Sequence, residues 1–130
     1  MTHIIATIGT TNYTATIQAG AHTLVADEPS ARGGQDAGPA PHELLVAALA
    51  ACTAITLRMY AQRKQWPVNG VHVDAQLRIA ADKTVAIDRV LKFDGDLNDE
   101  QRKRLAEIAE RTPVTLTLKS GVDIYTTLAA

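Results

Sequence analysis

The chain has little cysteine and no surplus of charge. Its 130 residues include one cysteine, Cys52, which cannot form a disulfide within the chain. A lone thiol is typical of a reducing compartment, where it is either a small buried hydrophobe or a reactive group. The 13 basic and 14 acidic side chains leave a formal net charge of -1. This balance excludes a strong field that would attract nucleic acid or an anionic membrane, so we expect neither partner.

Targeting and membrane-spanning patterns are also missing. The first nine residues, MTHIIATIG, carry no basic stretch and no long apolar run, so no secretory signal is expected. The apolar stretch near residues 44 to 55 is too short and too interrupted to span a bilayer. We therefore expect a cytoplasmic protein. A chain of this length can bury a core without disulfides or metal, and we expect one domain over residues 1–130.

The first 41 residues contain short apolar runs and a long break. β-branched residues at every second position mark runs at 3–8, 13–18 and 22–27, and Gly or Asn residues separate them. This pattern predicts an antiparallel meander. Residues 28–41, EPSARGGQDAGPAP, break every periodicity and predict a loop. Loops of this length inside a compact domain are often functional or mobile.

A long apolar helix is predicted over residues 42–64. The segment contains no Gly or Pro, starts with an acid and ends with bases, as the helix dipole favours. Residues 44–57 are apolar almost all round, so more than one side of the helix should be buried. In a chain of this size, we infer that one face packs on the chain's own sheet and the other on a second subunit.

The second half begins with a predicted pair of strands and a helix. Residues 71–79 alternate strictly between apolar and polar side chains, and residues 85–94 predict a second strand. Asn98 and Gln101 resemble a capping box, which marks the start of a helix. This helix must end before Pro113, because the residue before a proline disfavours helical backbone.

Two final strands are predicted at 114–118 and 122–128, with a turn between them. The resulting order of elements is βββ-α-ββ-α-ββ. It lacks the βαβ alternation that characterises a doubly wound parallel sheet. We therefore predict an α+β fold with antiparallel or mixed sheets around the long helix.

Cys52 is the residue best suited to chemistry. It lies in the middle of the apolar helix, where a space-filling core thiol is the interpretation that composition favours. A reactive thiol would instead need a cation or a helix N-terminus to stabilise its thiolate. No charged residue lies within one helical turn of Cys52. Any activating group must therefore come from the loop, from another element or from a second chain.

His42 and Glu43 begin the same helix. His42 precedes Cys52 by ten residues, which is about 15 Å of helix, so the two cannot touch along one straight helix. They could meet if two copies of the helix packed antiparallel about a two-fold axis. Taken alone, Glu43 is more simply explained by the helix dipole. The four histidines show no metal-ligand spacing, so neither a metal nor a cofactor is predicted.

The helix region carries a family resemblance. Residues 38–45, GPAPHELL, followed by residues 47–53, AALAACT, are similar to the helix signature of the OsmC/Ohr family. Residues 56–61 and 108–114 continue the likeness in the same order. The resemblance implies an OsmC-like fold in an intertwined homodimer, with the two long helices at its centre and the active sites at the dimer interface. It also implies reduction of organic hydroperoxides, or of hydrogen peroxide, by a pair of cysteines.

The resemblance can be carried over residue by residue. Cys52 matches the peroxidatic cysteine, whose thiolate attacks the O–O bond. The resolving cysteine would precede Pro113, where this chain has Thr112. His42 follows the proline at the place where the peroxidases have a glutamate. Glu43 matches instead the Pro-x-Glu-Leu-Leu form of the broader OsmC-like group.

Three functions fit this pattern. In a one-cysteine thiol peroxidase, Cys52 attacks a hydroperoxide and an external thiol resolves the sulfenate. Arg32, the only arginine before the helix, would then take the role of the family's arginine and steer the thiolate together with His42 or Glu43. The second function is a non-catalytic dimeric module with an apolar ligand pocket, in which Cys52 only packs. The third is an organisational role through dimerisation alone.

Overall fold

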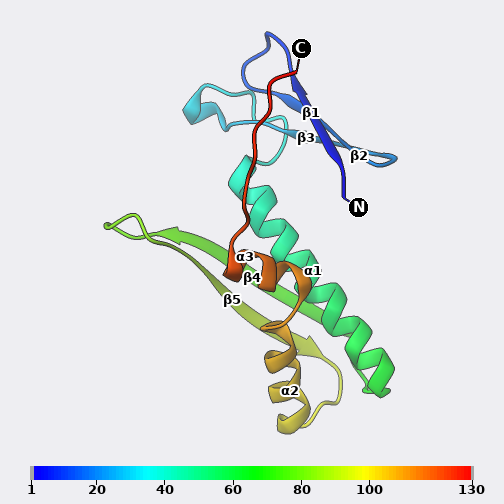
Figure 1. Cartoon of the computed structure of the whole chain (residues 1–130). Coiled ribbons are helices and arrows are strands. Elements are labelled where there is room, and N and C mark those ends of the chain that lie inside the picture. Colours follow the sequence, from blue (N-terminus) through cyan, green and yellow to red (C-terminus); the bar gives the residue numbers. More distant parts are fainter. Residues whose placement is uncertain (1, 130) are drawn as a thin grey trace. The chain divides into compact units, whose positions relative to one another are not determined.

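The computed structural model describes residues 2–129. Over these residues the chain forms three α-helices and two antiparallel sheets, which confirms the predicted α+β class (Figure 1). The chain divides into two compact units, residues 1–47 and 48–130, and each unit is described by itself. Helix α1 (Pro41–Lys64) begins in the first unit and continues into the second.

The first unit is built on a three-stranded antiparallel sheet in the order β1-β2-β3. Strands β1 (Ile4–Ile8), β2 (Ala15–Ala19) and β3 (His22–Ala26) pair consecutively, which confirms the predicted meander. A tight turn joins β2 to β3, and Gly20 in this turn has φ +60°. Glycine enters this left-handed region without steric cost.

One buried carboxylate organises the loop after β3. Asp27 is 2% exposed and accepts five hydrogen bonds of 2.7 to 3.2 Å. The donors are the backbone N–H groups of Tyr13, Glu28, Gln35 and Ala37 and the hydroxyl of Thr14. Burial alone would raise the pKa of Asp27, but the bonds from Ala37, Thr14 and the other donors hold it below its usual 3.8. The charged carboxylate therefore ties the predicted loop to the sheet.

Two glycines allow this loop to fold closely against the neighbouring backbone. A Cβ atom at Gly34 would lie 2.0 Å from the carbonyl oxygen of Glu28, and one at Gly38 would lie 2.2 Å from that of Val25. Both distances are far inside van der Waals contact. The loop conformation therefore depends on the absence of a side chain at these two positions.

The second unit contains a long two-stranded hairpin, drawn in green in Figure 1. Strands β4 (Gly70–Ile79) and β5 (Val85–Asp94) pair along their whole length, and both agree with the prediction to within one residue. Side chains from both strands, from α1 and from helix α2 (Asp99–Ala109) enclose the core. The buried apolar residues of this core are Leu57, Tyr60, Ala61, Val68, Phe93, Leu97, Leu105 and Ala109.

The predicted capping box at the start of α2 is confirmed. The Asn98 side chain accepts a hydrogen bond of 2.8 Å from the Gln101 backbone, and the Gln101 side chain accepts one of 3.0 Å from the Asn98 backbone. These reciprocal bonds satisfy backbone donors that the first turn of a helix leaves free. Leu105 then lies fully buried on the inward face of the helix.

The end of the chain differs from the prediction. The sequence predicts strands at 114–118 and 122–128, whereas the structure has helix α3 (Pro113–Ser120) over the first of these segments. Residues 121–129 form neither helix nor strand. The predicted order βββ-α-ββ-α-ββ is therefore wrong in its last two elements, and the described chain ends its regular structure in a helix.

Capping explains why this β-branched segment is helical. Thr112 is the N-cap of α3, and Pro113 occupies the first turn, where proline is favoured. The more buried positions are Val114, Thr115 and Leu118. This spacing places one helix face inward and does not follow the two-residue period of a strand. The alternation of Val and Leu with Thr in the sequence is therefore misleading.

Helix α1 is long and apolar enough, by length and composition alone, to cross a bilayer. The core helices of soluble proteins meet the same criteria. In the second unit, Leu57 and Ala61 of α1 are fully buried among the residues of the core. These contacts are those of a core helix.

Candidate functional site

Cys52 lies on α1 with a partly exposed side chain. Its Sγ is 3.9 Å from Oγ1 of Thr56, one helical turn later, and either atom could be the donor. Within residues 2–129 this is the one polar contact that the structure gives to the thiol. Cys52 is therefore neither sealed in the core nor paired with a charged group in the described second unit.

Arg32 lies in the first unit, in the loop that Asp27 organises. It ends a short 3-10 helix, Ser30–Arg32, and its side chain is 75% exposed. Its Nε lies 3.5 Å from a carboxylate oxygen of Glu28. Arg32 therefore has an acidic partner in its own unit, and its role beside Cys52 stays a prediction.

His42 and Glu43 are exposed in the first turn of α1. Oε1 of Glu43 accepts a hydrogen bond of 3.0 Å from the backbone N–H of Ala40. This bond satisfies a free donor at the start of the helix, where a carboxylate also complements the dipole. Within residues 2–129, neither side chain bonds to another predicted site residue, and a role for them at the thiol stays a prediction.

Thr112, at the position of the missing resolving cysteine, is fully buried. Its Oγ1 accepts a hydrogen bond of 3.4 Å from the backbone N–H of Thr115 and lies 2.6 Å from the Thr115 hydroxyl. The hydroxyl therefore caps helix α3. A threonine cannot form a disulfide. Cys52 is the only cysteine of the chain, so it has no thiol partner at this position.

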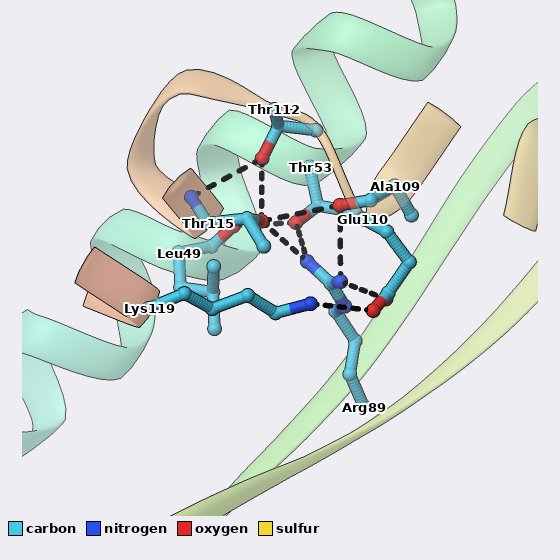
Figure 2. Close-up of polar contacts among 8 residues, drawn as sticks. All are labelled: Leu49, Thr53, Arg89, Ala109, Glu110, Thr112, Thr115 and Lys119. Carbon is cyan, nitrogen blue, oxygen red and sulfur yellow. Dashed lines mark hydrogen bonds and ion pairs between the residues drawn. The ribbon is translucent and has the colours of Figure 1, made fainter. Parts of the chain in front are cut away.

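Arg89 gathers the polar groups around Thr112 into one network (Figure 2). Its Nη1 donates to the hydroxyls of Thr53 at 2.8 Å and Thr115 at 3.0 Å. Its Nη2 donates to the Ala109 carbonyl at 3.0 Å and to Oε2 of Glu110 at 2.9 Å. The guanidinium side chain is 11% exposed. We call the following set the Arg89 network: Thr53, Arg89, Ala109, Glu110, Thr112, Thr115 and Lys119.

One arrangement of the hydroxyl protons gives every hydroxyl of this network an acceptor. A guanidinium only donates, so the oxygens of Thr53 and Thr115 must accept from Arg89. The Thr53 hydroxyl then donates to a carbonyl one turn earlier in α1, at 2.7 Å. The Thr115 hydroxyl donates to the Ala109 carbonyl at 3.1 Å, which leaves Thr112 to donate to Thr115. The network therefore satisfies each of its hydroxyl groups.

Glu110 and Lys119 form the outer end of the network. Oε1 of Glu110 lies 2.7 Å from Nζ of Lys119, while its other oxygen bonds to Arg89. The hydrogen bond from Lys119 is the main reason why the pKa of Glu110 lies below its usual 4.5. Burial opposes this effect, and the charge of Lys119 and the bond from Arg89 reinforce it. An ionised carboxylate thus joins the end of α2 to the end of α3.

The Arg89 network connects the two positions that the resemblance singles out. Thr53 directly follows Cys52, and Thr112 occupies the place of the resolving cysteine. The connection runs from Thr53 through Arg89 and Thr115 to Thr112. This arrangement can hold α1, β5 and α3 together at the residue that follows Cys52, but it supplies no second redox group.

Sequence reasoning did not identify Arg89, although the sequence contains a sign of it. Arg89 shares the inward face of β5 with Ile87, Leu91 and Phe93. Arginine is almost never fully buried unless it is paired. A charged residue among alternating inward hydrophobic residues therefore predicts a buried polar partner, but the sequence does not say which one. Within residues 2–129, no group of three or more His, Cys, Asp or Glu side chains could hold a metal ion.

A model of the OsmC-like protein family matches residues 33–127 of the chain. The matched region includes Cys52, Arg89 and Thr112. A comparison with curated proteins gave no match.

Several solved structures have a similar fold. An OsmC-like protein from Mycoplasma pneumoniae is 18% identical, with 92% of this chain and 87% of that chain covered and a TM-score of 0.79. An organic hydroperoxide resistance protein OsmC from Legionella pneumophila is 22% identical, with 95% and 92% covered and a TM-score of 0.66. An organic hydroperoxide resistance protein from Elizabethkingia anophelis is 19% identical, with 90% and 87% covered and a TM-score of 0.65. At these identities the likeness establishes the fold.

Proposed function

The chain belongs to the OsmC-like protein family, and from this premise we propose that it reduces organic hydroperoxides through Cys52 with an external thiol as reductant. The observation that carries the proposal is the partly exposed Cys52 thiol on α1, within the region that the family model matches. Two of the similar structures described above are organic hydroperoxide resistance proteins, which supports the choice of substrate class.

The proposed reaction needs two molecules of external thiol per turnover. The Cys52 thiolate attacks one oxygen of the hydroperoxide, the O–O bond breaks, and the departing alkoxide takes a proton and leaves as the alcohol. Cys52 is now sulfenic acid. A first external thiol displaces water and forms a mixed disulfide with Cys52. A second external thiol attacks this disulfide, releases the oxidised reductant and restores the Cys52 thiol.

The external thiol is required because Thr112 cannot resolve the sulfenic acid. In the two-cysteine mechanism that the resemblance implies, the second sulfur would come from this position. Here a buried hydroxyl caps α3 instead. An unresolved sulfenic acid at Cys52 would be exposed to further oxidation to the sulfinic acid. The proposal therefore includes a small thiol that enters from solvent.

A non-catalytic module is the second candidate, and one observation favours it. Within residues 2–129, the only polar contact of Cys52 is the hydroxyl of Thr56 at 3.9 Å. A thiol without a cationic neighbour is a weak nucleophile near neutral pH. In this alternative the chain keeps the family fold to bind a small apolar ligand, and Cys52 only contributes to packing.

We propose that the functional form is a homodimer. In the first unit, both faces of the sheet expose large apolar side chains, including Ile4, Ile5 and Ile8 at 51%, 55% and 52%. In the second unit, Ile55 and Met59 of α1 are 56% and 63% exposed. So many large apolar side chains exposed on one small sheet and one helix are unusual for a monomer. A second copy of the chain is the proposed cover.

Single-turnover oxidation tests the proposed reaction. Reduced protein is mixed with one equivalent of cumene hydroperoxide in the presence of dimedone, and mass spectrometry locates the adduct. Trapping at Cys52 much faster than at free cysteine supports a peroxidatic thiol, and Cys52→Ser should give no adduct. Thr56→Ala removes the hydroxyl near the sulfur and keeps the thiol, so it should still give the adduct at Cys52. Trapping no faster than at free cysteine would contradict the peroxidase and favour the apolar module.

A further inference from the structure

A second polar site surrounds Tyr60, near the end of α1, and it does not involve Cys52. The Tyr60 side chain is part of the core, and the residue is 8% exposed. Its hydroxyl accepts a hydrogen bond of 3.1 Å from Nε of Arg104 on α2. The Trp66 ring packs edge-on against the Tyr60 ring, with centroids 5.5 Å apart and planes at 70°. A buried aromatic pair therefore holds the ends of α1 and α2 together.

Three cationic side chains converge on the Tyr60 ring. The Cζ of Arg63, the Nζ of Lys64 and the Cζ of Arg104 lie 5.7, 5.7 and 5.9 Å from its centroid. All three distances fall within the range of a cation–π contact, which is about 6 Å. We call Arg63, Lys64 and Arg104 the Tyr60 basic cluster. Each charged group therefore lies within 5.9 Å of the same ring centroid, which gathers the three cations around one side chain.

Carboxylates neutralise only part of the positive charge of the Tyr60 basic cluster. Arg104 pairs with Glu107 at 3.0 Å. Over residues 2–129, the ion pairs include neither Arg63 nor Lys64. Tyr60 itself responds to this field. The hydrogen bond from Arg104, followed by the charges of Arg104, Lys64 and Arg63, holds the pKa of Tyr60 below its usual 10, although burial opposes the shift.

The helix dipole does not account for this surplus. Backbone groups already satisfy carbonyls at the end of α1, because Gln65 N–H donates to Gln62 and Trp66 N–H donates to Ala61, at 3.0 and 2.9 Å. Such a pair of bonds is the Schellman arrangement, with Gln65 at φ +58°. A helix C-terminus carries roughly half a negative charge. Arg63 and Lys64 together carry two positive charges, which exceed the negative charge of the helix end.

We propose that the Tyr60 basic cluster binds a phosphate-class oxyanion, such as the phosphate group of a small phosphorylated metabolite. Arg63 offers paired N–H donors that match the geometry of a phosphate, and Lys64 adds a point charge. Arg104 adds the N–H donors that its bonds to Tyr60 and Glu107 leave free. The ring of Tyr60 keeps the three cations together before the anion arrives. Little conformational freedom is then lost when the anion binds, which favours binding.

Trp66 provides the measurement, because it is the only tryptophan of the chain and contacts Tyr60. The full-length protein is titrated with inorganic phosphate and with pyrophosphate, while sodium chloride holds the ionic strength constant, and Trp66 fluorescence is recorded. We expect a saturable change, with pyrophosphate binding more tightly than phosphate. The double variant Arg63→Gln, Lys64→Gln should weaken binding by about tenfold or more, since it removes both cations that have no carboxylate partner among the described residues.

The matched control is Arg102→Gln, Lys103→Gln, which removes the same charge from α2 without touching the Tyr60 ring. It should leave the affinity within about twofold of the wild type. Vesicles that contain phosphatidic acid form a third arm, which separates a free phosphate from a lipid headgroup that offers the same chemistry. Equal losses in both double variants would mean general screening and would overturn the proposal. The absence of saturable binding in all three arms would also overturn it.

Discussion

Nη1 of Arg89 lies 2.8 Å from the hydroxyl oxygen of Thr53, so strand β5 is bonded directly to the residue that follows Cys52 in α1. The same nitrogen bonds to Thr115 of α3 at 3.0 Å. A single donor atom therefore joins two helices that are more than 50 positions apart in the sequence. Arg89 therefore adds a polar link to the apolar contacts that hold the thiol-bearing helix in the second unit.

Replacing Arg89 should destabilise the protein strongly. Arg89→Gln removes the donors to Thr53 and Thr115 and to the Ala109 carbonyl, and leaves these buried oxygens short of partners. We expect a loss of about 2–4 kcal/mol in the free energy of unfolding, measured by urea denaturation. Arg89→Lys should recover only part of it, because one ammonium group cannot replace a fork of donors.

Arg78→Gln is the control for this prediction. Arg78 also lies on the hairpin and pairs with Asp88, but the two side chains are 63% and 56% exposed. Exposed ion pairs contribute little to stability, so the free energy of unfolding should change far less than in Arg89→Gln. Equal losses for Arg78→Gln and Arg89→Gln would show that the network has no special role in stability.

The hydroxyl of Thr112 should be required for the stability of the fold, because it caps helix α3. Thr112→Val keeps the shape of the side chain but removes the cap of α3, and we expect a loss of about 1–2 kcal/mol. Thr112→Ser keeps the hydroxyl and should change the stability by less than about 1 kcal/mol. The backbone N–H of Thr115 donates a hydrogen bond to the Thr112 hydroxyl. Hydrogen exchange of this amide should therefore be faster in Thr112→Val than in the wild type or in Thr112→Ser. If the two variants are equally stable, the capping role assigned here is wrong.

Asp27 should make the protein sensitive to acid. Its folded-state pKa lies below the usual 3.8, so the unfolded chain takes up the proton first as the pH falls. The stability from Asp27 is therefore fully present above about pH 5 and is lost progressively as the pH falls through 4 toward the folded-state pKa. The midpoint of urea unfolding should depend less on pH in Asp27→Asn than in the wild type. The variant should also be less stable than the wild type at pH 7. Asp74→Asn, on the exposed face of β4, is the control and should retain the wild-type slope.

The loop that carries Arg32 should tolerate no side chain at Gly34. A methyl group in Gly34→Ala would overlap the Glu28 carbonyl oxygen, so the backbone must move, at a cost of about 2 kcal/mol in the free energy of unfolding. At Gly9 an added Cβ meets nothing within 4 Å, so Gly9→Ala should be nearly neutral. Limited proteolysis should cut the loop faster in the Gly34 variant. Similar proteolysis of both variants would contradict the tight packing described above.

A second copy should cover the exposed apolar side chains. Sedimentation at micromolar concentration should give a dimer, and Met59→Glu should shift the population toward monomer because it places a charge among apolar groups. Lys83→Glu, in the exposed turn between β4 and β5, makes a larger charge change away from these groups and should leave the dimer intact. A monomeric wild-type protein would contradict the dimer and any site formed between two copies.

Local patterns predicted most of the elements, because they depend on local chemistry. The meander, the hairpin and the capping box at Asn98 follow from residue alternation and turn or cap residues, which act over a few positions. The segment after Thr112 was predicted wrongly for the same reason. Its β-branched alternation outweighed the cap of Thr112 and the proline at the first helical position, although these two features decide the helix.

The candidate site was only partly predictable. Cys52 and Thr112 can be named because each is a single position on a motif. The partners of Arg89 could not be named, because Thr53 lies 36 positions away and Thr115 lies 26 positions away. Contacts at such separations depend on how the hairpin packs against the helices, and no local periodicity reports this. Likewise, Asp27 is an ordinary acid in the sequence until the loop folds around it.

The fixed direction of the hydroxyl protons has a consequence for the order in which protons move during the proposed reaction. When the O–O bond breaks, the departing alkoxide must receive a proton. Thr53 cannot provide it, because its oxygen accepts from Arg89 and its own proton is held by a carbonyl of α1. Thr56, 3.9 Å from the sulfur, is the nearby hydroxyl that this network leaves out. Within the described second unit, Thr56 and solvent water are then left as proton sources, so oxidation of Cys52 should slow in heavy water, and the replacement of Thr56 should change the size of that isotope effect.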